Sequence, residues 1–302
     1  MSKEGLKYYL KHPKQIYGFF ASRGMLNWVS DKAYLKMVYK NSFGKKLNLK
    51  NPQTFNEKLQ WLKLYNRKDI YTAMVDKYQV KKLITDKIGA DYIIPTINVY
   101  DKFEDINLDE LPNQFVLKCT HDSGGLVICK DKSCLDLEKA KKKIKKSLKV
   151  NYFWLSREWP YKNVKPRIIA EEFVGEISNS LVVYKVFCFN GTAKIIQVIQ
   201  GDKTKQESID YFDDNWNLLD LRQNYPNSLE HLPKPQLLDE MLKLSGELSK
   251  GYPFLRVDWY IVNNKLKFSE FTFYSDSGLS KFYPDEWDLK LGEMIKLDKM
   301  EK

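Results

Sequence analysis

The chain has 302 residues, of which 43% are hydrophobic and 14% aromatic, and it carries a formal charge of +11. This composition is typical of a packed globular protein and excludes a disordered one, and the length predicts two or three lobes around one cleft. The positive charge predicts attraction to anions such as nucleotide phosphates, acidic glycans, nucleic acid or a membrane surface, without choosing among them.

Three further features are not expected from the sequence: a zinc site, a signal peptide and a transmembrane segment. The four cysteines form no CxxC pair and the three histidines are scattered, so no zinc site is expected, and the cysteines are interpreted as reduced thiols of a cytoplasmic protein. Charged residues and a proline interrupt the first apolar runs, so we expect neither a signal peptide nor a transmembrane segment. Peripheral contact with the inner face of a membrane is left open.

The first third of the chain is predicted to be mainly helical. Residues 1 to about 70 are basic and aromatic-rich, and within them Thr54 and Glu57 have the spacing of a capping box. A further helix is expected over 71–88, ending near Gly89. Runs of β-branched and aromatic residues then predict strands over 92–99 and 115–119.

Seven lysines lie between Lys139 and Lys149, with Ala140, Ile144 and Leu148 at helical spacing. This pattern predicts a surface helix with a solvated basic face. Contact of this face with an acidic polymer is the alternative.

The rest of the chain is predicted to be mostly β structure. The dipeptide Asn190-Gly191 favours a two-residue hairpin turn, because both positions readily adopt positive φ. A helix is expected over 235–249. Strands are expected over 168–173, 181–189 and 193–199, and a last hairpin is built on Arg256–Tyr260 and Phe268–Thr272.

A glycine-containing loop joins two of the predicted strands. The strand at 115–119 leads into a loop with Gly124 and Gly125, and a second apolar run follows at 126–128. This pattern predicts a flap whose backbone N–H groups cradle phosphate oxygens, with Lys118 as a fixed positive charge at its base. An ordinary hairpin with a glycine turn is the alternative.

Several common catalytic and nucleotide-binding motifs are absent. The neighbours His121, Asp122 and Ser123 cannot align as a catalytic triad, and the chain has no GxSxG. It also has no GxGxxG, no GxxxxGK[ST] and no DxD, which argues against Rossmann, P-loop and common glycosyltransferase sites.

Lys185 lies within an otherwise apolar predicted strand. A buried ammonium group is costly unless it is paired, so Lys185 needs a phosphate or a carboxylate as its partner. A structural ion pair with Glu171 or Glu172 is the alternative to a phosphate contact.

Asp258 and Glu270 lie on the two strands of the last predicted hairpin, and paired carboxylates of this kind suit Mg²⁺ and hence a nucleotide. With a two-residue turn at Asn263-Asn264 the two carboxylates face opposite sides of the sheet. With a three-residue loop that begins at Val262 they share one face. We expect the three-residue loop, although the two-residue turn groups the apolar residues more tidily.

Taken in order, these segments resemble the ATP-grasp superfamily, and more closely its TupA-like branch, which is associated with teichuronopeptide and surface-polysaccharide synthesis. The similarity runs from about residue 35 to 292. It is carried by the segments 51–62, 75–78, 115–118, 157–159, 166–172, 184–191 and 254–260.

The resemblance implies an α+β ATP-grasp fold, in which two α+β lobes clamp ATP. Its expected divisions are a helical N-terminal region over 1–70, a first lobe with the flap over 71–170 and a second lobe with the Mg²⁺-binding hairpin over 171–302.

The resemblance also implies a role for each matching residue. Arg256 and Lys118 are expected to act on the transferring phosphoryl group. The Mg²⁺ ligands are expected to be Asp258, Glu270 and Thr272, where Thr272 replaces the asparagine of many ATP-grasp ligases. The nucleotide is expected to contact Lys77, Lys118, His121, Ser123, Gly124, Gly125, Glu171, Glu172, Phe173, Val174, Glu176 and Lys185.

The function that the resemblance implies is ATP-dependent carboxylate–amine ligation through an acylphosphate. By analogy with the branch, the acid is expected to be a uronic acid of a surface polysaccharide and the amine an amino acid, with no nucleic acid partner. Substrate contacts are expected from the N-terminal helices, Arg222, Lys281 or the loop 274–278. The alternatives are a sugar-nucleotide-dependent glycosyltransferase of capsule or O-antigen synthesis and a non-catalytic basic binder of glycan or nucleic acid.

Overall fold

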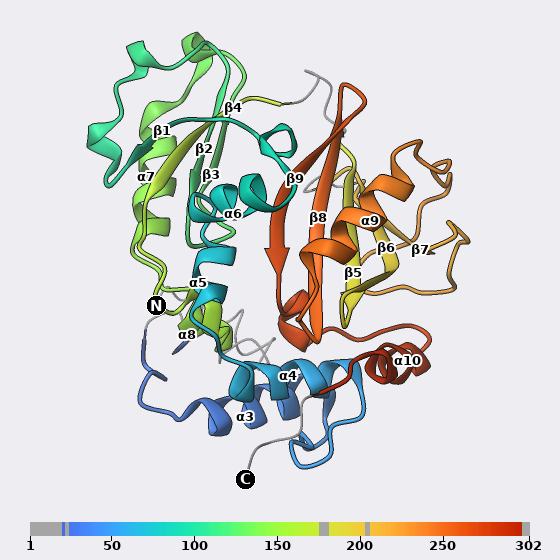
Figure 1. Ribbon diagram of the computed structural model, residues 1–302. Coiled ribbons are helices and arrows are strands. Elements are labelled where there is room, and N and C mark those ends of the chain that lie inside the picture. Colours follow the sequence, from blue (N-terminus) through green and yellow to red (C-terminus); the bar gives the residue numbers. More distant parts are fainter. Residues whose placement is uncertain (1–19, 22–23, 175–180, 203–205, 298–302) are drawn as a thin grey trace.

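The computed structural model describes residues 20–21, 24–174, 181–202 and 206–297, and these form two antiparallel sheets above a helical base (Figure 1). The mixture of helices with two sheets confirms the predicted α+β class. Within the described residues no helix has both the length and the apolar character needed to cross a bilayer.

The first sheet has four strands in the order β1-β4-β2-β3. Helix α7 (Leu137–Leu148) packs on it and buries Ala140 and Ile144 against the strands, so the predicted lysine-rich surface helix is present. The strands are β1 (Thr96–Tyr100), β2 (Phe115–Cys119), β3 (Leu126–Cys129) and β4 (Ile168–Glu172).

The second sheet has five strands in the order β7-β6-β5-β8-β9, and helix α9 (Leu238–Leu248) covers one of its faces (Figure 1). Asn190 and Gly191 have positive φ and join β5 to β6, which confirms the predicted hairpin turn. The strands are β5 (Val183–Phe189), β6 (Thr192–Gln200), β7 (Ser208–Asp213), β8 (Phe254–Val262) and β9 (Lys265–Thr272). Strand β7 was not predicted from the sequence.

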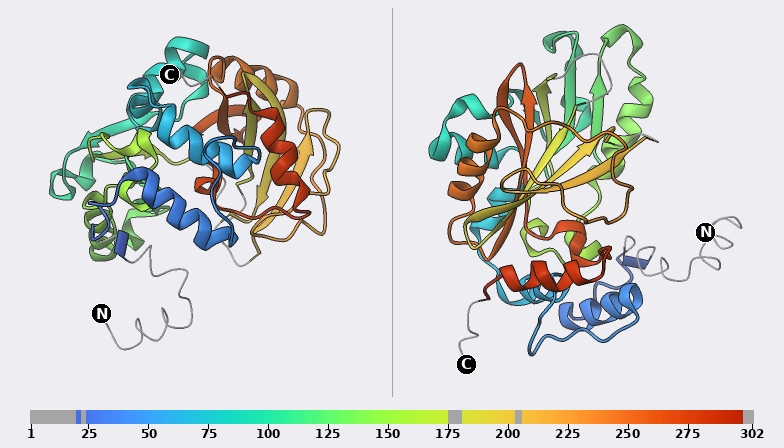
Figure 2. Two further views of the ribbon diagram at one scale, coloured as in Figure 1. Left: turned by 90° about the horizontal axis from the view of Figure 1, so that it is seen from below. Right: turned by 90° about the vertical axis from the view of Figure 1, so that its right-hand side faces the viewer.

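The helices α3 (Asp31–Phe43), α4 (Phe55–Tyr65) and α10 (Glu286–Met294) lie together at one end of the molecule (Figure 2). Thr54 and Glu57 form the predicted capping box at the start of α4. The buried amide of Asn56 donates to Asp288 Oδ1 over 2.9 Å, which joins α4 to α10 from the far end of the chain.

The helix predicted over 71–88 is two helices in the structure, α5 (Ile70–Val75) and α6 (Gln79–Ile88). The break occurs because Asp76 leaves the helical conformation with ψ 112°, while its carboxylate accepts hydrogen bonds from the N–H groups of Tyr78 and Gln79. Lys77 lies at this break, and its backbone N–H donates to the carbonyl of Thr120 over 3.1 Å.

The prediction of a three-residue loop between β8 and β9 is wrong. Asn263 and Asn264 both have positive φ, and Val262 pairs directly with Lys265, so the turn has two residues. This turn matches the twist of the flanking strands and keeps Trp259 opposite Phe268 in the core.

Candidate functional site

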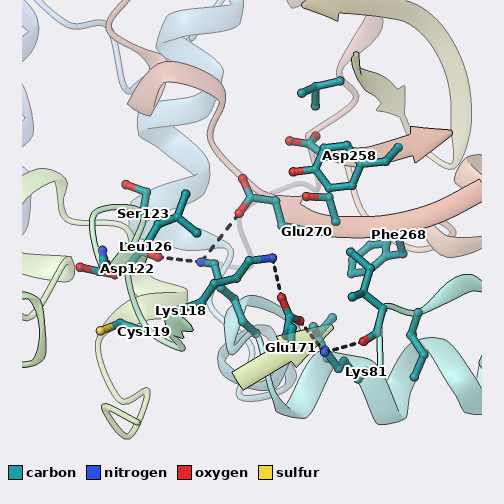
Figure 3. Close-up of a pocket in the computed structure, with 18 of the residues that line it drawn as sticks. Lys81, Lys118, Cys119, Asp122, Ser123, Leu126, Glu171, Asp258, Phe268 and Glu270 are labelled. Carbon is teal, nitrogen blue, oxygen red and sulfur yellow. Dashed lines mark hydrogen bonds and ion pairs between the residues drawn. The ribbon is translucent and has the colours of Figure 1, made fainter. Parts of the chain in front are cut away.

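A cavity of about 340 Å³ lies between the two sheets, where lysines from both sheets meet carboxylates (Figure 3). Its volume falls within the range of small-molecule sites. The cationic lining comes from Lys77, Lys81, Lys118 and Lys185, and the acidic lining from Asp122, Glu171, Asp202, Asp258 and Glu270. Apolar lining comes from Val80, Ile93, Ile94, Leu126, Val183, Tyr260 and Phe268.

A β-bulge in β9 places Asp258 directly opposite Glu270. Trp259 pairs with Phe268, but the next residue of β8, Asp258, pairs with Glu270, so Ser269 is an extra residue in β9. The bulge shifts the register by one residue, and the two carboxylates then share the face that lines the cavity. The predicted shared face is therefore present, but a bulge produces it and the turn does not.

Arg256 binds Asp258 through two parallel hydrogen bonds, both of 2.7 Å. Both side chains are buried, and Arg256 also donates to Ser275 Oγ and Thr272 Oγ1. Burial opposes the charge of Arg256, but the Asp258 carboxylate outweighs burial and raises the pKa of the guanidinium. The pair is thus a fixed charged unit whose arginine also lies 4.0 Å from Glu270 Oε1.

Lys77 connects the flap loop to the second sheet. Its Nζ donates to the carbonyl of Asp122 over 2.6 Å and lies 3.8 Å from Glu270 Oε2. Burial works against the charge of Glu270, but Lys77 and then Arg256 outweigh it and lower the pKa of that carboxyl. Glu270 is therefore held ionised at the edge of the cavity, as a metal ligand must be.

Glu171 on β4 holds two lysines at the first sheet. Its carboxylate is 2.5 Å from Lys81 Nζ and 2.6 Å from Lys118 Nζ (Figure 3). Burial alone would lower the pKa of Lys118, but Glu171 outweighs burial and raises it. Two positive charges against one negative charge leave this wall of the cavity with a net positive charge.

Lys185 is part of a polar row across the inner face of the second sheet. Across the strands Glu270 lies opposite Asp258, Asp258 opposite Lys185, and Lys185 opposite Gln197. Its ammonium makes no hydrogen bond or ion pair with any described residue, so the alternative of a structural ion pair with Glu171 or Glu172 is not found there. Burial, and then the charge of Arg256, lower the pKa of Lys185.

The flap loop is anchored to the last turn of α7. His121 Nε2 lies 3.2 Å from the carbonyl of Ser147, whose hydroxyl donates to the Asp122 carboxylate. The N–H of Gly125 donates to Asp122 Oδ1 over 3.0 Å, so this N–H is taken within the loop. Gly125 is needed for packing, because a Cβ there would lie 2.6 Å from Ser147 Oγ.

The structure gathers some of the predicted site residues and separates others. Those that line the cavity are Lys77, Lys118, Ser123, Gly125, Glu171, Lys185, Asp258 and Glu270. Arg256 touches the site through Asp258. Those that do not line it are His121, Gly124, Glu172, Phe173, Val174 and Thr272, and Glu176 lies outside the described residues.

The expected third metal ligand is engaged elsewhere, because Thr272 Oγ1 accepts a hydrogen bond of 2.9 Å from Arg256. Among the described residues no group of three or more histidine, cysteine or acidic side chains is placed to hold a metal ion. Asp258 and Glu270 therefore offer an incomplete set, which suits a cation that keeps phosphate oxygens and waters as further ligands.

Lys81 was missed by reasoning from the sequence. It lies on α6 and reaches Glu171, the carbonyl of Ile94 and the hydroxyl of Thr96. Its neighbour Lys82 makes only a surface ion pair with Asp86. The local sequence spacing does not distinguish Lys81 from Lys82. The difference arises only in the folded protein, where β4 brings Glu171 to one side of α6.

A cavity between two sheets, lined by lysines and by facing carboxylates on a hairpin, is the arrangement expected for the ATP-grasp class of proteins. The model of the TupA-like ATP-grasp family matches residues 57–296, and the chain belongs to this family. The predicted fold and family are thereby confirmed, and the chain is an ATP-grasp enzyme. No curated protein matches the sequence at the level of significance required.

Solved structures similar to this chain are ATP-grasp ligases of low sequence identity. D-alanine–D-alanine ligase from Helicobacter pylori is 16% identical, with a TM-score of 0.44 over 80% of this chain and 69% of that one. D-alanine–D-alanine ligase from Bacillus anthracis, complexed with ATP, is 17% identical, with a TM-score of 0.42 over 74% and 63%. The ATP-grasp ligase PsnB, complexed with a precursor variant, Mg and ADP, is 11% identical, with a TM-score of 0.41 over 79% and 65%.

Proposed function

We propose that this protein is an ATP-dependent carboxylate–amine ligase that binds Mg²⁺-ATP in the cavity between the sheets. The observation that carries the proposal is the convergence of Lys77, Lys118 and Lys185 on the facing carboxylates Asp258 and Glu270. Such a cavity neutralises a polyphosphate from several sides, while the carboxylates require a cation between themselves and the phosphates.

The residues present fit a magnesium nucleotide. Lys185 is a half-buried cation without a bond to any described residue, and a phosphate oxygen would supply the partner that it lacks. Asp258 and Glu270 would hold Mg²⁺, with water at a third position, because the Thr272 hydroxyl is engaged by Arg256. When bound, Mg²⁺ supplies charge neutralisation of the phosphates.

The adenine would occupy the apolar part of the cavity. Val183 and Tyr260 lie opposite each other on β5 and β8, two pairs further along the sheet than Lys185 and Asp258. The segment 171–174 at the end of β4 is the proposed hinge, and Glu171 is its member that lines the cavity. Glu172 and Glu176 remain the expected partners of the ribose hydroxyls.

In the first step a substrate carboxylate oxygen attacks the γ-phosphorus. The bond from that phosphorus to the β–γ bridging oxygen breaks, which gives an acylphosphate and ADP. In this proposal Lys118 of the first sheet and Arg256 of the second stabilise charge on the moving group. Arg256 is well suited, because its pairing with Asp258 and Ser275 fixes its orientation.

In the second step an amine nitrogen attacks the acyl carbon. The carbon–nitrogen bond forms, the bond from carbon to the phosphate oxygen breaks, phosphate leaves, and the protons released by the nitrogen pass to solvent. The flap loop 121–125 would exclude water, which otherwise hydrolyses the acylphosphate. The product is an amide.

The acid is proposed to be a uronic acid of a surface polysaccharide and the amine an amino acid. Membership of the TupA-like family supports this assignment, and the formal charge of +11 favours an acidic glycan as substrate. Catalysis at the inner face of a membrane, where such polymers are assembled, is part of the same proposal.

The proposal is tested by ADP release with ATP and Mg²⁺ across a panel of uronic acids and amino acids. Release that depends on both substrates, and that is lost in Lys118→Ala and Glu270→Gln, supports a ligase. Lys142→Ala is the matched control, because Lys142 is exposed on α7 and does not line the cavity. Turnover of a sugar nucleotide without ADP release would instead indicate a glycosyltransferase.

A further inference from the structure

Glu158 is a buried carboxylate that the nucleotide site does not use. It lies just after α8 (Phe153–Ser156), with 5% of its surface exposed. Its Oε1 accepts hydrogen bonds from Ser156 Oγ at 2.9 Å and from Ser277 Oγ at 2.5 Å. No donor among the described residues reaches Oε2, and this oxygen is not sealed from solvent.

No cation of the described chain pairs with Glu158. The nearest candidate is Lys63 of α4, which is fully buried, but its ammonium donates to the carbonyls of Ser156 and Ser277 at 2.9 and 2.8 Å. Burial, only partly opposed by Glu158, lowers the pKa of Lys63 to about 8. Glu158 is therefore a buried carboxylate that accepts from hydroxyl groups and with which no cation of the described chain forms an ion pair, so a further cationic partner would stabilise it.

One turn links this carboxylate to the reaction centre. The η7 turn (Ser275–Gly278) follows β9, and its Ser275 hydroxyl accepts from Arg256 while its Ser277 hydroxyl donates to Glu158. Glu158 thus lies a single turn away from the arginine proposed to act on the phosphoryl group (Figure 1 shows α8 beside the foot of the second sheet).

Two tyrosines are influenced by the charges of both Glu158 and Glu270. Tyr152 and Tyr161 contact each other with ring centroids 5.0 Å apart. Burial, and then the charge of Glu158, raise the pKa of Tyr152 to about 12, and Glu270 acts on it in the same direction. The pKa of Tyr161 is raised by burial and then by Glu270 and Glu158, so both tyrosines lie within electrostatic range of both carboxylates.

The backbone holds Glu158 in place at a conformational cost. Asp276 and Ser277 are consecutive residues with left-handed φ of 47° and 56°, and Arg157, next to Glu158, has φ 56°. Left-handed conformations of such residues persist only where the surroundings enforce them, and they gather at ligand sites. Here Gln60 and Lys63 bind the carbonyls of the turn, and the Arg157 guanidinium binds the carbonyl of Leu26.

We propose that Glu158 binds the ammonium group of the amine substrate and positions it beside the acyl phosphate, with Tyr152 and Tyr161 as the walls of this subsite. The inference rests on the proposed ligase function. It identifies the second substrate of the ligase as a primary amine that enters the site as a cation. A carboxylate with an open oxygen attracts an ammonium group and repels an acid, so this subsite selects the amine and the lysine-rich cavity selects the phosphates.

The test is calorimetric titration of the ADP–Mg²⁺-saturated protein with amines and their hydroxyl analogues: L-alanine against L-lactate, and glucosamine against glucose. We expect at least one amine to bind about 10-fold or more tightly than its hydroxyl analogue. We expect Glu158→Gln to weaken the binding of that amine by a similar factor. Glu158→Asp should recover part of the affinity. The matched control is Glu138→Gln, since Glu138 is exposed at the start of α7.

Two results would overturn the inference while the ligase proposal stands: ADP binds but no amine of the panel does, or Glu158→Gln binds the amine as the wild type does. Undetectable ADP binding in the wild type would instead overturn the ligase proposal. If Glu158→Gln fails to fold, Ser277→Ala replaces it, since it removes one of the two hydrogen bonds to Glu158. Unchanged amine affinity in Ser277→Ala would then count against the subsite.

Discussion

Asp258 lies directly opposite Glu270 in the β8–β9 hairpin, although the two-residue turn of this hairpin would place their side chains on opposite faces of a regular ladder. The extra residue Ser269 corrects the register between the turn and the carboxylates. With the bulge, Trp259 and Phe268 stay in the core while both carboxylates line the cavity. A regular ladder with the same turn could not place both pairs in this way.

Deletion of Ser269 is predicted to retain the carboxylate pair. Without the extra residue the two-residue turn alone brings Glu270 opposite Asp258, and the pairs nearer the open end of the hairpin keep their partners. We expect Mg²⁺-dependent ADP binding to persist, measured by calorimetry. Loss of the Mg²⁺ dependence to the extent seen in Glu270→Gln would show that the bulge does more than set the register.

Asp258→Asn and Glu270→Gln are predicted to differ in their effect on stability. Asp258→Asn leaves the buried Arg256 without its carboxylate, which should cost about 3–5 kcal/mol of unfolding free energy. The Glu270 side chain is 38% exposed, so Glu270→Gln should cost less than about 1 kcal/mol.

Both substitutions should weaken Mg²⁺-dependent ADP binding by about 10-fold or more. Urea unfolding and calorimetry measure the two effects separately. Equal destabilisation by the two substitutions would contradict the assignment of Asp258 as the structural partner of Arg256.

Gly125 and Gly124 are predicted to respond differently to alanine. A Cβ on Gly125 would lie 2.6 Å from Cys119 Cβ and Ser147 Oγ, whereas one on Gly124 meets only Asp122 Oδ2 at 3.6 Å. Gly125→Ala should therefore destabilise the protein by about 1–3 kcal/mol, and Gly124→Ala should be close to neutral. Thermal unfolding of both variants checks this, and an equal shift of Tm in both would refute the packing role of Gly125.

Glu171 is predicted to contribute to acid unfolding. Burial would raise its pKa, but Lys118 and Lys81 outweigh burial and hold the pKa below the ordinary value of 4.5. Because the folded state binds this proton less readily than the unfolded state, the contribution is full above pH 4.5 and is lost as the pH falls through the lowered pKa.

The stability difference between the wild type and Glu171→Gln should accordingly be largest near neutral pH and shrink below pH 4.5. Urea unfolding of both proteins across this range provides the measurement. A difference that stays constant with pH would mean that Glu171 does not act through its charge.

Local sequence signals predicted the parts of the fold that depend on neighbouring residues. The capping box at Thr54 and the turn at Asn190-Gly191 form as expected, because each is a contact between residues close in the chain. The lysine-rich helix also forms, since the spacing of Ala140 and Ile144 needs only one apolar surface to pack against.

The parts of the site that sequence reasoning missed depend on distant segments. The bulge at Ser269 cannot be read from the hairpin sequence, because the apolar pattern favours the two-residue turn and contains no signal for an extra residue beyond Phe268. Glu158 gains its surroundings from Ser277, which is 119 residues away in the chain. The pairing of Glu171 with Lys81 and Lys118 likewise arises only when β4 lies between β1 and β2.

Calorimetric titration of the wild type with ADP, with and without Mg²⁺, tests most directly whether the cavity between the sheets is a nucleotide site. We expect binding that strengthens with Mg²⁺, and we expect Lys118→Ala to abolish it while Lys142→Ala does not. Absence of ADP binding by the folded wild type, or equal binding by Lys118→Ala, would contradict the account.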